Sequence, residues 1–176
     1  MNEQQLHKIV QRFTATDDLQ QLIKRQEMVK DLINLLNNSL VEDAEDLQSY
    51  LSSSALFTQE DLSDEVSEVS GKEHLLSQLT FLNVRLATQQ KLVKEKNLRK
   101  ILGEKGYKTE SRWDDFGLHI EISIKNGVRG VLVLSQEVIA DCTPDELLSR
   151  LERYHWQEMV AANNGKALYF TNNGFR

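Results

Sequence analysis

The stretch LHIEISI, residues 118–124, alternates strictly between aliphatic and polar side chains. Its four aliphatic residues fall on one face of an extended chain, and the other face carries His119, Glu121 and Ser123. Alternation with a period of two is typical of a strand that buries one face and exposes the other. The sequence therefore predicts a sheet in this part of the chain.

Neighbouring segments extend this strand into a meander. Residues 107–113 are a candidate first strand, and Asp114–Gly117 has the composition of a turn. After the central strand, residues 125–127 (Lys-Asn-Gly) contain the favoured two-residue hairpin signal, and residues 128–134 follow as a third strand. We expect three antiparallel strands joined by short turns.

A helix follows the meander. Thr143-Pro144-Asp145-Glu146 combines an N-cap threonine, a proline at the first helical position and a glutamate three residues after the cap. The helix is predicted to run to about Ala162, where Asn163-Asn164-Gly165 ends it, and residues 166–171 are a candidate fourth strand. Residues 103–176 are thus expected to form a small α+β domain.

The first 70 residues contain neither glycine nor proline, which favours long helices. A short helix is predicted at 2–13 and a longer one at about 17–52. With Leu19 as the first core position, the longer helix follows a heptad pattern. Its core positions include Val29, Ile33, Leu36 and Leu40, with polar interruptions at Gln26 and Asp43.

A second long helix is expected after an acidic, serine-rich connector at about 52–70. Ser70 and Glu73 fit a capping box at its start, and Gly103 or Gly106 ends it. The seam residues of this helix are Leu75, Leu79, Leu82 and Leu86. Residues 1–102 are therefore predicted to form a coiled-coil-like helical hairpin, the stem, whose last turns from about residue 97 pack on the small domain.

Composition narrows the range of functions. A net charge of −6 argues against a protein dedicated to coating DNA, and a single cysteine, Cys142, excludes an internal disulfide framework. No apolar run approaches the length of a membrane span, and the N-terminus has no signal segment, which predicts a cytoplasmic protein with no membrane contact.

No catalytic motif is found in the sequence. Phosphate-binding glycine loops, serine elbows and metal-binding His and Cys patterns are missing. Asp114, Asp115, His119 and Glu121 are the best candidates for an acid–base or metal cluster. Turn preference and the polar face of a strand account for each of them separately, and we favour that interpretation. We therefore expect no enzyme, no cofactor and no metal.

Basic residues are concentrated between residues 91 and 105. The group comprises Lys91, Lys94, Lys96, Arg99, Lys100 and Lys105. One interpretation is a nucleic-acid-binding segment, with Tyr107 and Trp113 as stacking aromatics. The other, which we favour, is pairing with the acidic side chains of residues 17–35 across an antiparallel hairpin.

Two families share the predicted order of elements. A helix, a three-stranded meander and a helix resemble the double-stranded-RNA-binding domain in outline, but the acidic start at Thr143–Glu146 differs from the basic helix start of such domains. A helical coiled coil followed by a small α/β domain also resembles the RWD-type domains at the ends of kinetochore coiled coils. That resemblance implies a stem for assembly and a head for partner recognition.

These observations predict a non-enzymatic interaction or assembly protein, an adaptor or scaffold. The stem is expected to associate with a protein partner, identical or not, and a homo-oligomer is expected. In the head, the turn residues Trp113, Asp114, Asp115 and Phe116 are predicted to contribute to a protein-binding surface, because aromatic anchors are frequent in binding hot spots. The alternative function is that of a nucleic-acid-associated accessory protein using residues 91–105.

Overall fold

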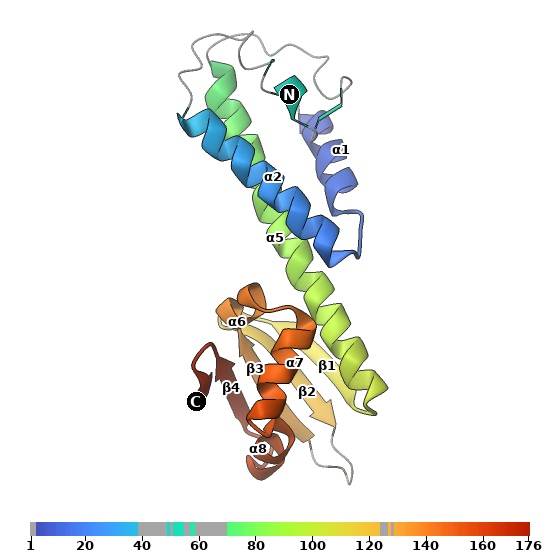
Figure 1. Ribbon diagram of the computed structural model, residues 1–176. Coiled ribbons are helices and arrows are strands. Elements are labelled where there is room, and N and C mark those ends of the chain that lie inside the picture. Colours follow the sequence, from blue (N-terminus) through green and yellow to red (C-terminus); the bar gives the residue numbers. More distant parts are fainter. Residues whose placement is uncertain are drawn as a thin grey trace. The chain divides into compact units, whose positions relative to one another are not determined.

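The computed structural model describes residues 3–38, 49, 51–54, 57–58, 70–123, 127 and 129–176. The chain forms two compact units, Met1–Gln90 and Lys91–Arg176, which we call the first and the second unit. The first is helical, and the second combines helices with a sheet (Figure 1). The prediction of a mixed helix-and-sheet protein with a long helix is confirmed.

The first unit contains three long described helical segments. They are α1 (Glu3–Thr14), α2 (Leu19–Asn38) and the N-terminal part of α5 (Ser70–Glu104). Asp18 begins α2, because its Oδ1 accepts hydrogen bonds from the backbone N–H groups of Gln20 and Gln21 at 3.0 and 3.2 Å. Of the helix predicted over 17–52, residues 39–48 and 50 lie outside the described residues.

A polar ladder joins α2 to α5 within one chain. Gln26 Nε2 donates to Asn83 Oδ1 at 3.0 Å, and Gln90 Nε2 donates to Gln26 Oε1 at 2.8 Å. Gln90 Nε2 also lies 3.4 Å from the carbonyl oxygen of Leu22. As the residue number falls along α2, the partner number rises along α5, so the two helices run antiparallel. Gln26, a polar interruption of the predicted seam, is therefore paired.

The second unit contains a sheet whose described strands are arranged in the order β1-β2-β3-β4-β5. The strands are β1 (Lys108–Trp113), β2 (Gly117–Ser123), β3 (Arg129–Ser135), β4 (Ala167–Thr171) and β5 (Gly174–Phe175). The first three form the predicted antiparallel meander. β4 pairs with β3 in parallel, and β5 returns antiparallel to β4.

Helices cover one face of this sheet (Figure 1). They are α6 (Gln136–Asp141), α7 (Pro144–Arg153), α8 (Trp156–Ala162) and the C-terminal part of α5. The aliphatic side chains of β2 and β3, such as Ile120 and its cross-strand partner Leu132, pack into this core with Leu98 and Leu102 of α5. The predicted capping box at Thr143 and Glu146 is present.

The single helix predicted from residue 144 to about 162 is wrong. The structure has two helices there, and His155 between them adopts a left-handed backbone with φ of 52°. The change of direction places Trp156 and Val160 in the core. Val160 packs so closely on β3 that a Cβ at Gly130 would lie 1.9 Å from its Cγ1.

The predicted strand count also needs correction. The expected sheet of three strands with a candidate fourth is a mixed sheet of five described strands. The chain returns through α6, α7 and α8 before β4 begins, and such a crossover connection allows parallel pairing with β3. The short β5 was not predicted from the sequence. Of the predicted hairpin signal at 125–127, Gly127 alone is described, with φ of +76°.

Candidate protein-interaction surface

The second face of the sheet, which we call the outer face, carries the side chains that point away from the core helices. Strand register arranges these side chains in three rows. The basic row is Lys108, Ser123 and Arg129; the glutamate row is Glu110, Glu121, Val131 and Ala167; the histidine row is Arg112, His119, Val133 and Tyr169. The turn between β1 and β2, residues 114–116, continues this surface beyond the histidine row.

Asp114 holds the turn in shape. Its Oδ1 accepts hydrogen bonds from the backbone N–H groups of Phe116 at 3.0 Å and Gly117 at 3.1 Å. The hydrogen bond from Gly117 is the main cause that keeps the pKa of the Asp114 carboxyl below its ordinary value of 3.8. The bond from Phe116 and the nearby charges of His119 and Arg112 act in the same direction and, with it, outweigh desolvation.

The other carboxylate oxygen of Asp114 faces a histidine. Asp114 Oδ2 lies 2.5 Å from His119 Nε2 and 3.5 Å from Arg112 Nη1. Arg112 Nη2 lies 3.3 Å from His119 Nδ1. Because a guanidinium only donates, Nδ1 accepts and the imidazole proton resides on Nε2, which lies beside the Asp114 carboxylate without forming a well-aligned hydrogen bond. These contacts lock the buried His119 in one orientation.

A second set of hydrogen bonds anchors the turn from behind. The backbone N–H of Gln136 donates to the Phe116 carbonyl at 3.0 Å, and its side-chain Nε2 donates to the Asp115 carbonyl at 2.9 Å. Lys91 Nζ donates to Gln136 Oε1 at 2.9 Å and lies 5.9 Å from the centre of the Trp113 ring. The turn is therefore fixed before any partner binds.

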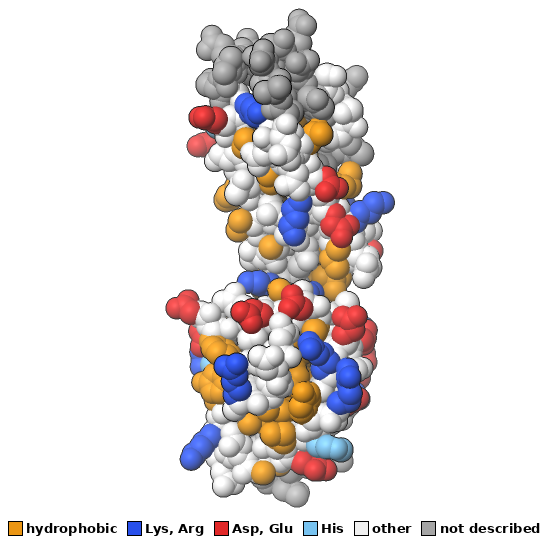
Figure 2. Space-filling model, turned by 60° about the vertical axis from the view of Figure 1, so that its left-hand side comes forward, with side chains coloured by type: hydrophobic (Ala, Val, Ile, Leu, Met, Phe, Trp, Pro, Cys, Tyr) orange, Lys and Arg blue, Asp and Glu red, His pale blue; other side chains and the backbone are white. Residues whose placement is uncertain are grey.

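Two aromatic rings are exposed beside this fixed turn. Phe116 and Tyr169 pack edge to face with ring centres 4.9 Å apart, and they are 43% and 37% exposed. Trp113 is instead half-buried, and its Nε1 donates to Glu95. Figure 2 shows that charged side chains of both signs are interspersed with exposed hydrophobic side chains over the second unit. Of the four predicted turn residues, Asp114, Asp115 and Phe116 are exposed, as a binding surface requires.

Most of the predicted stem residues are buried. Among the described seam positions, buried side chains are Val29, Leu36, Leu75, Leu79, Leu82 and Leu86. Ile33 is half-buried, and its neighbour Leu32 occupies the buried position in its place. Leu40 lies outside the described residues.

The six basic residues of segment 91–105 do not form one surface. Lys94 is 8% exposed, and its Nζ donates to the carbonyl oxygens of Ile139 and Ala140 at 2.6 and 2.9 Å, at the C-terminus of α6. Burial lowers the pKa of this ammonium below 10.5. Lys105 pairs with Glu152 at 2.7 Å, and Lys91 bonds to Gln136. Pairing of these lysines with residues 17–35 would join the two units and stays a prediction.

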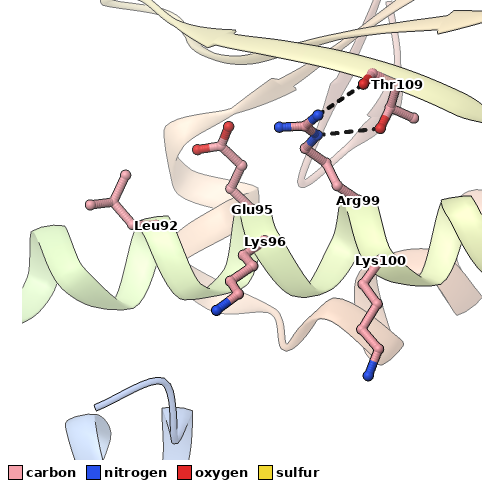
Figure 3. A pocket seen from close by; sticks show the side chains of 6 residues that line it. All are labelled: Leu92, Glu95, Lys96, Arg99, Lys100 and Thr109. Atoms are coloured by element: carbon pink, nitrogen blue, oxygen red, sulfur yellow. Dashed lines mark hydrogen bonds between the residues drawn. The ribbon is translucent and has the colours of Figure 1, made fainter. Parts of the chain in front are cut away.

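The remaining three basic residues belong to the lining of a hollow on α5 beside β1; Arg99 points toward β1, whereas Lys96 and Lys100 point to the other side of the helix (Figure 3). Its volume is about 360 Å³, and its lining residues are Leu92, Glu95, Lys96, Arg99, Lys100 and Thr109. Arg99 is held by the carbonyl and hydroxyl oxygens of Thr109, at 2.9 and 3.3 Å. Glu95 accepts hydrogen bonds from Ser111 and Trp113, so its carboxylate fixes β1 on α5.

The acid–base or metal cluster considered from the sequence is only partly assembled. Asp114 and His119 meet, but Glu121 stands in another row, opposite Glu110. Among the described residues no group of three or more His, Cys, Asp or Glu side chains is placed to hold a metal ion. None of the described helices is long and apolar enough to cross a membrane.

Sequence reasoning missed Tyr169, Arg112 and Gln136 as parts of this surface. Their roles depend on non-local pairing: Tyr169 joins the histidine row only because β4 lies parallel to β3, with Val133 opposite Tyr169. The alternation of residues 166–171 is too short to show which strand they join. Arg112 could have been predicted from the sequence, because it lies two residues before Asp114 and side chains two residues apart in an extended chain lie on the same face.

No family model, no curated protein and no solved structure matches this chain. The function is therefore inferred from the geometry of the described residues.

Proposed function

We propose that this chain is a non-enzymatic protein-interaction or assembly protein, an adaptor, that binds a protein partner through the outer face of its sheet. The observation that carries this proposal is the exposed Phe116–Tyr169 pair beside a fixed turn. Exposed aromatics on a rigid support are favoured in binding hot spots, because they bury a large area and lose little conformational entropy.

The charges around the aromatic pair support specific recognition. Asp115 is exposed at the turn, and Arg112 and the two glutamates of the glutamate row are exposed on the strands. A hydrophobic centre surrounded by charges is the usual layout of a non-obligate interface. The charges would select the partner and its orientation more than they would raise affinity.

The stem has a different part in this proposal. Its buried leucines and the Gln26–Gln90 ladder are used within the first unit, where α2 and α5 pack on each other. The proposed stem therefore supports assembly as a rigid helical element, and the sheet provides the recognition surface.

Capture of partners by the full-length chain tests the proposal. Immobilised wild-type protein and a Phe116→Ser variant are incubated with extract of the source cells, and bound proteins are quantified. Met159→Ser is the matched control, because Met159 on α8 is 37% exposed, close to the 43% of Phe116, but lies away from the outer face. We expect Phe116→Ser to lose specific partners that Met159→Ser retains. Equal capture by all three proteins would contradict the proposal.

The second candidate is a nucleic-acid-associated accessory protein. The hollow bordered by Lys96, Arg99 and Lys100 favours it, but Lys94 is buried and Lys91 and Lys105 are bonded within the second unit. Phosphate contacts by three cations would give a log–log slope of affinity against salt of about −2 to −3. Binding of a duplex or single-stranded oligonucleotide with that slope, lost in Lys96→Glu with Lys100→Glu, would support this candidate.

A further inference from the structure

We propose that the outer face of the sheet binds the outer face of a second copy of this chain, in a two-fold symmetric, face-to-face pair. The two-fold axis lies in the interface, perpendicular to the strands, between the glutamate row and the histidine row. This inference rests on the proposed function, because it names the partner of the same surface.

The sign of the charge alternates along the strands of the outer face. The basic row, with Lys108 and Arg129, comes first, and the glutamate row follows. The histidine row then brings Arg112, and the turn ends the series with two aspartates, Asp114 and Asp115. Rows on one face are separated by two residues, or about 6.8 Å, so each row is a distinct stripe.

This alternation is self-complementary under the proposed symmetry. Rotation about the axis keeps the order of the strands and reverses their direction. Glu110 therefore faces the partner's Arg112. Glu121 faces the row of the partner's His119, whose buried ring is already held by Asp114 and Arg112 and takes no part in the interface. Lys108 of the basic row faces the partner's turn and its aspartates, whereas Arg129 on β3 faces the partner's Ser135. At a sheet separation of about 10 Å, glutamate and arginine side chains reach each other.

The apolar residues follow the same rule. Val131 in the glutamate row lies on β3, as does Val133 in the histidine row. The rotation places Ala167 against the partner's Tyr169, which is 37% exposed, whereas Val133 is fully buried in its own chain and makes no contact across the interface. A two-fold axis parallel to the strands would instead set glutamates against glutamates. The charge pattern therefore selects one of the two symmetric arrangements.

The isolated chain has two like charges side by side, and the proposed dimer would place a positive charge near them. Glu110 and Glu121 are directly opposite on β1 and β2, and both are exposed. Like charges directly opposite in a sheet are destabilising. Among the described residues neither glutamate has a hydrogen-bond or ion-pair partner. A second copy would supply an arginine opposite Glu110 and so offset the repulsion between the two glutamates.

Charge-swap variants of the full-length chain test the symmetry directly. In Glu110→Arg, two arginines meet across the axis, and in Arg112→Glu, two glutamates meet. In the double variant, Glu110→Arg with Arg112→Glu, opposite charges meet again. We expect wild type and the double variant to sediment as dimers. Each single variant should raise the dimer dissociation constant by at least about tenfold.

Controls separate loss of the interface from loss of the fold. Glu158→Arg makes the same charge change as Glu110→Arg at an exposed position of α8, and this variant should remain dimeric. Circular dichroism and melting temperature should be close to wild type for every variant used. A monomeric wild type at several hundred micromolar, or a double variant as weak as the single variants, would overturn the proposal.

The outcomes also distinguish this inference from the proposed function. If wild type is monomeric but Phe116→Ser alone loses partner capture, the face binds another protein and the second copy is rejected. If Phe116→Ser captures partners as well as Met159→Ser does, the proposed function fails, whereas the charge-swap variants alone decide the second copy. If wild type binds an oligonucleotide through Lys96 and Lys100 and is monomeric, the nucleic-acid candidate replaces them.

Discussion

Gly117, the first residue of β2, shows how one missing side chain permits the β1–β2 turn. A Cβ at this position would lie 1.9 Å from the carbonyl oxygen of Leu134 and 3.0 Å from the backbone nitrogen of Gln136. Neither backbone atom can move without disturbing the sheet or the anchor of the turn. Gly117→Ala should therefore lower the free energy of unfolding by roughly 1–3 kcal/mol.

Gly103 provides the control for that prediction, which urea titration measures. It lies within α5, and a Cβ there would meet nothing within 4 Å. Gly103→Ala should stabilise the chain by about 0.5–1 kcal/mol, because alanine loses less backbone entropy in a helix. If the two substitutions had the same effect, the close contact at Gly117 would be disproved.

Asp114 gives the turn a dependence on acid. Its pKa is lowered in the folded chain, chiefly by the hydrogen bond from Gly117, so ionised Asp114 favours the folded state. That contribution is complete above the ordinary value of 3.8 and is lost as the pH falls through the lower folded value. Asp114→Asn should melt below wild type at pH 7, and the difference should shrink below about pH 4. A melting-point difference independent of pH would refute this assignment.

At the residue scale, contacts between residues that are close in the sequence could be predicted. The capping box at Thr143 and Glu146 was recognisable because both partners lie within one helical turn. The role of Asp114 as a turn residue was also recognisable. Its pairing with His119 was not, because that contact depends on strand register. The left-handed backbone of His155 could not be predicted from the local sequence, because it is the burial of Trp156 in the core that requires the chain to change direction there.

At the scale of elements, α2 has one buried face, and adjacent leucines lie on opposite sides of its boundary. Leu36 is 0% exposed and Leu35 is 44% exposed. Leu36→Asp should reduce the free energy of unfolding by roughly 3–5 kcal/mol, because it removes apolar burial and buries an unpaired carboxylate. Leu35→Asp should change it by less than about 0.5 kcal/mol. Thermal melting of both variants checks the burial, and equal destabilisation would show that the assigned face is wrong.

Periodicity predicted which elements form but not how they associate. The meander and the long helix follow from alternation and from helix-favouring composition, and both are confirmed. The parallel pairing of β4 with β3 could not be predicted, because the pattern of a five-residue strand does not show which strand it pairs with. The basic segment was misleading for a related reason. Clustering in sequence does not mean clustering in space, since a helix turns Lys94 inward and Lys100 outward.

At the scale of the whole molecule, both tryptophans, Trp113 and Trp156, belong to the second unit. Tryptophan fluorescence therefore reports the second unit, whereas far-ultraviolet circular dichroism also reports the helices of the first. We expect Leu36→Asp to lower the circular-dichroism melting temperature and to leave the fluorescence transition within about 2 °C of wild type. Coincident shifts of both probes would show that the units unfold as one.

The parallel pairing of β3 with β4 has a consequence for the order of folding. Strands β1 to β3 are joined by short connections. Val131 of β3 pairs with Ala167 of β4, and three helices separate these two strands in the sequence. Closing that longer loop costs more chain entropy before any contact offsets it. During refolding, amide protons of β2 should therefore become protected against exchange before those of β4. We therefore predict that the meander is the folding nucleus of the second unit and that β4, with its exposed Tyr169, is added last.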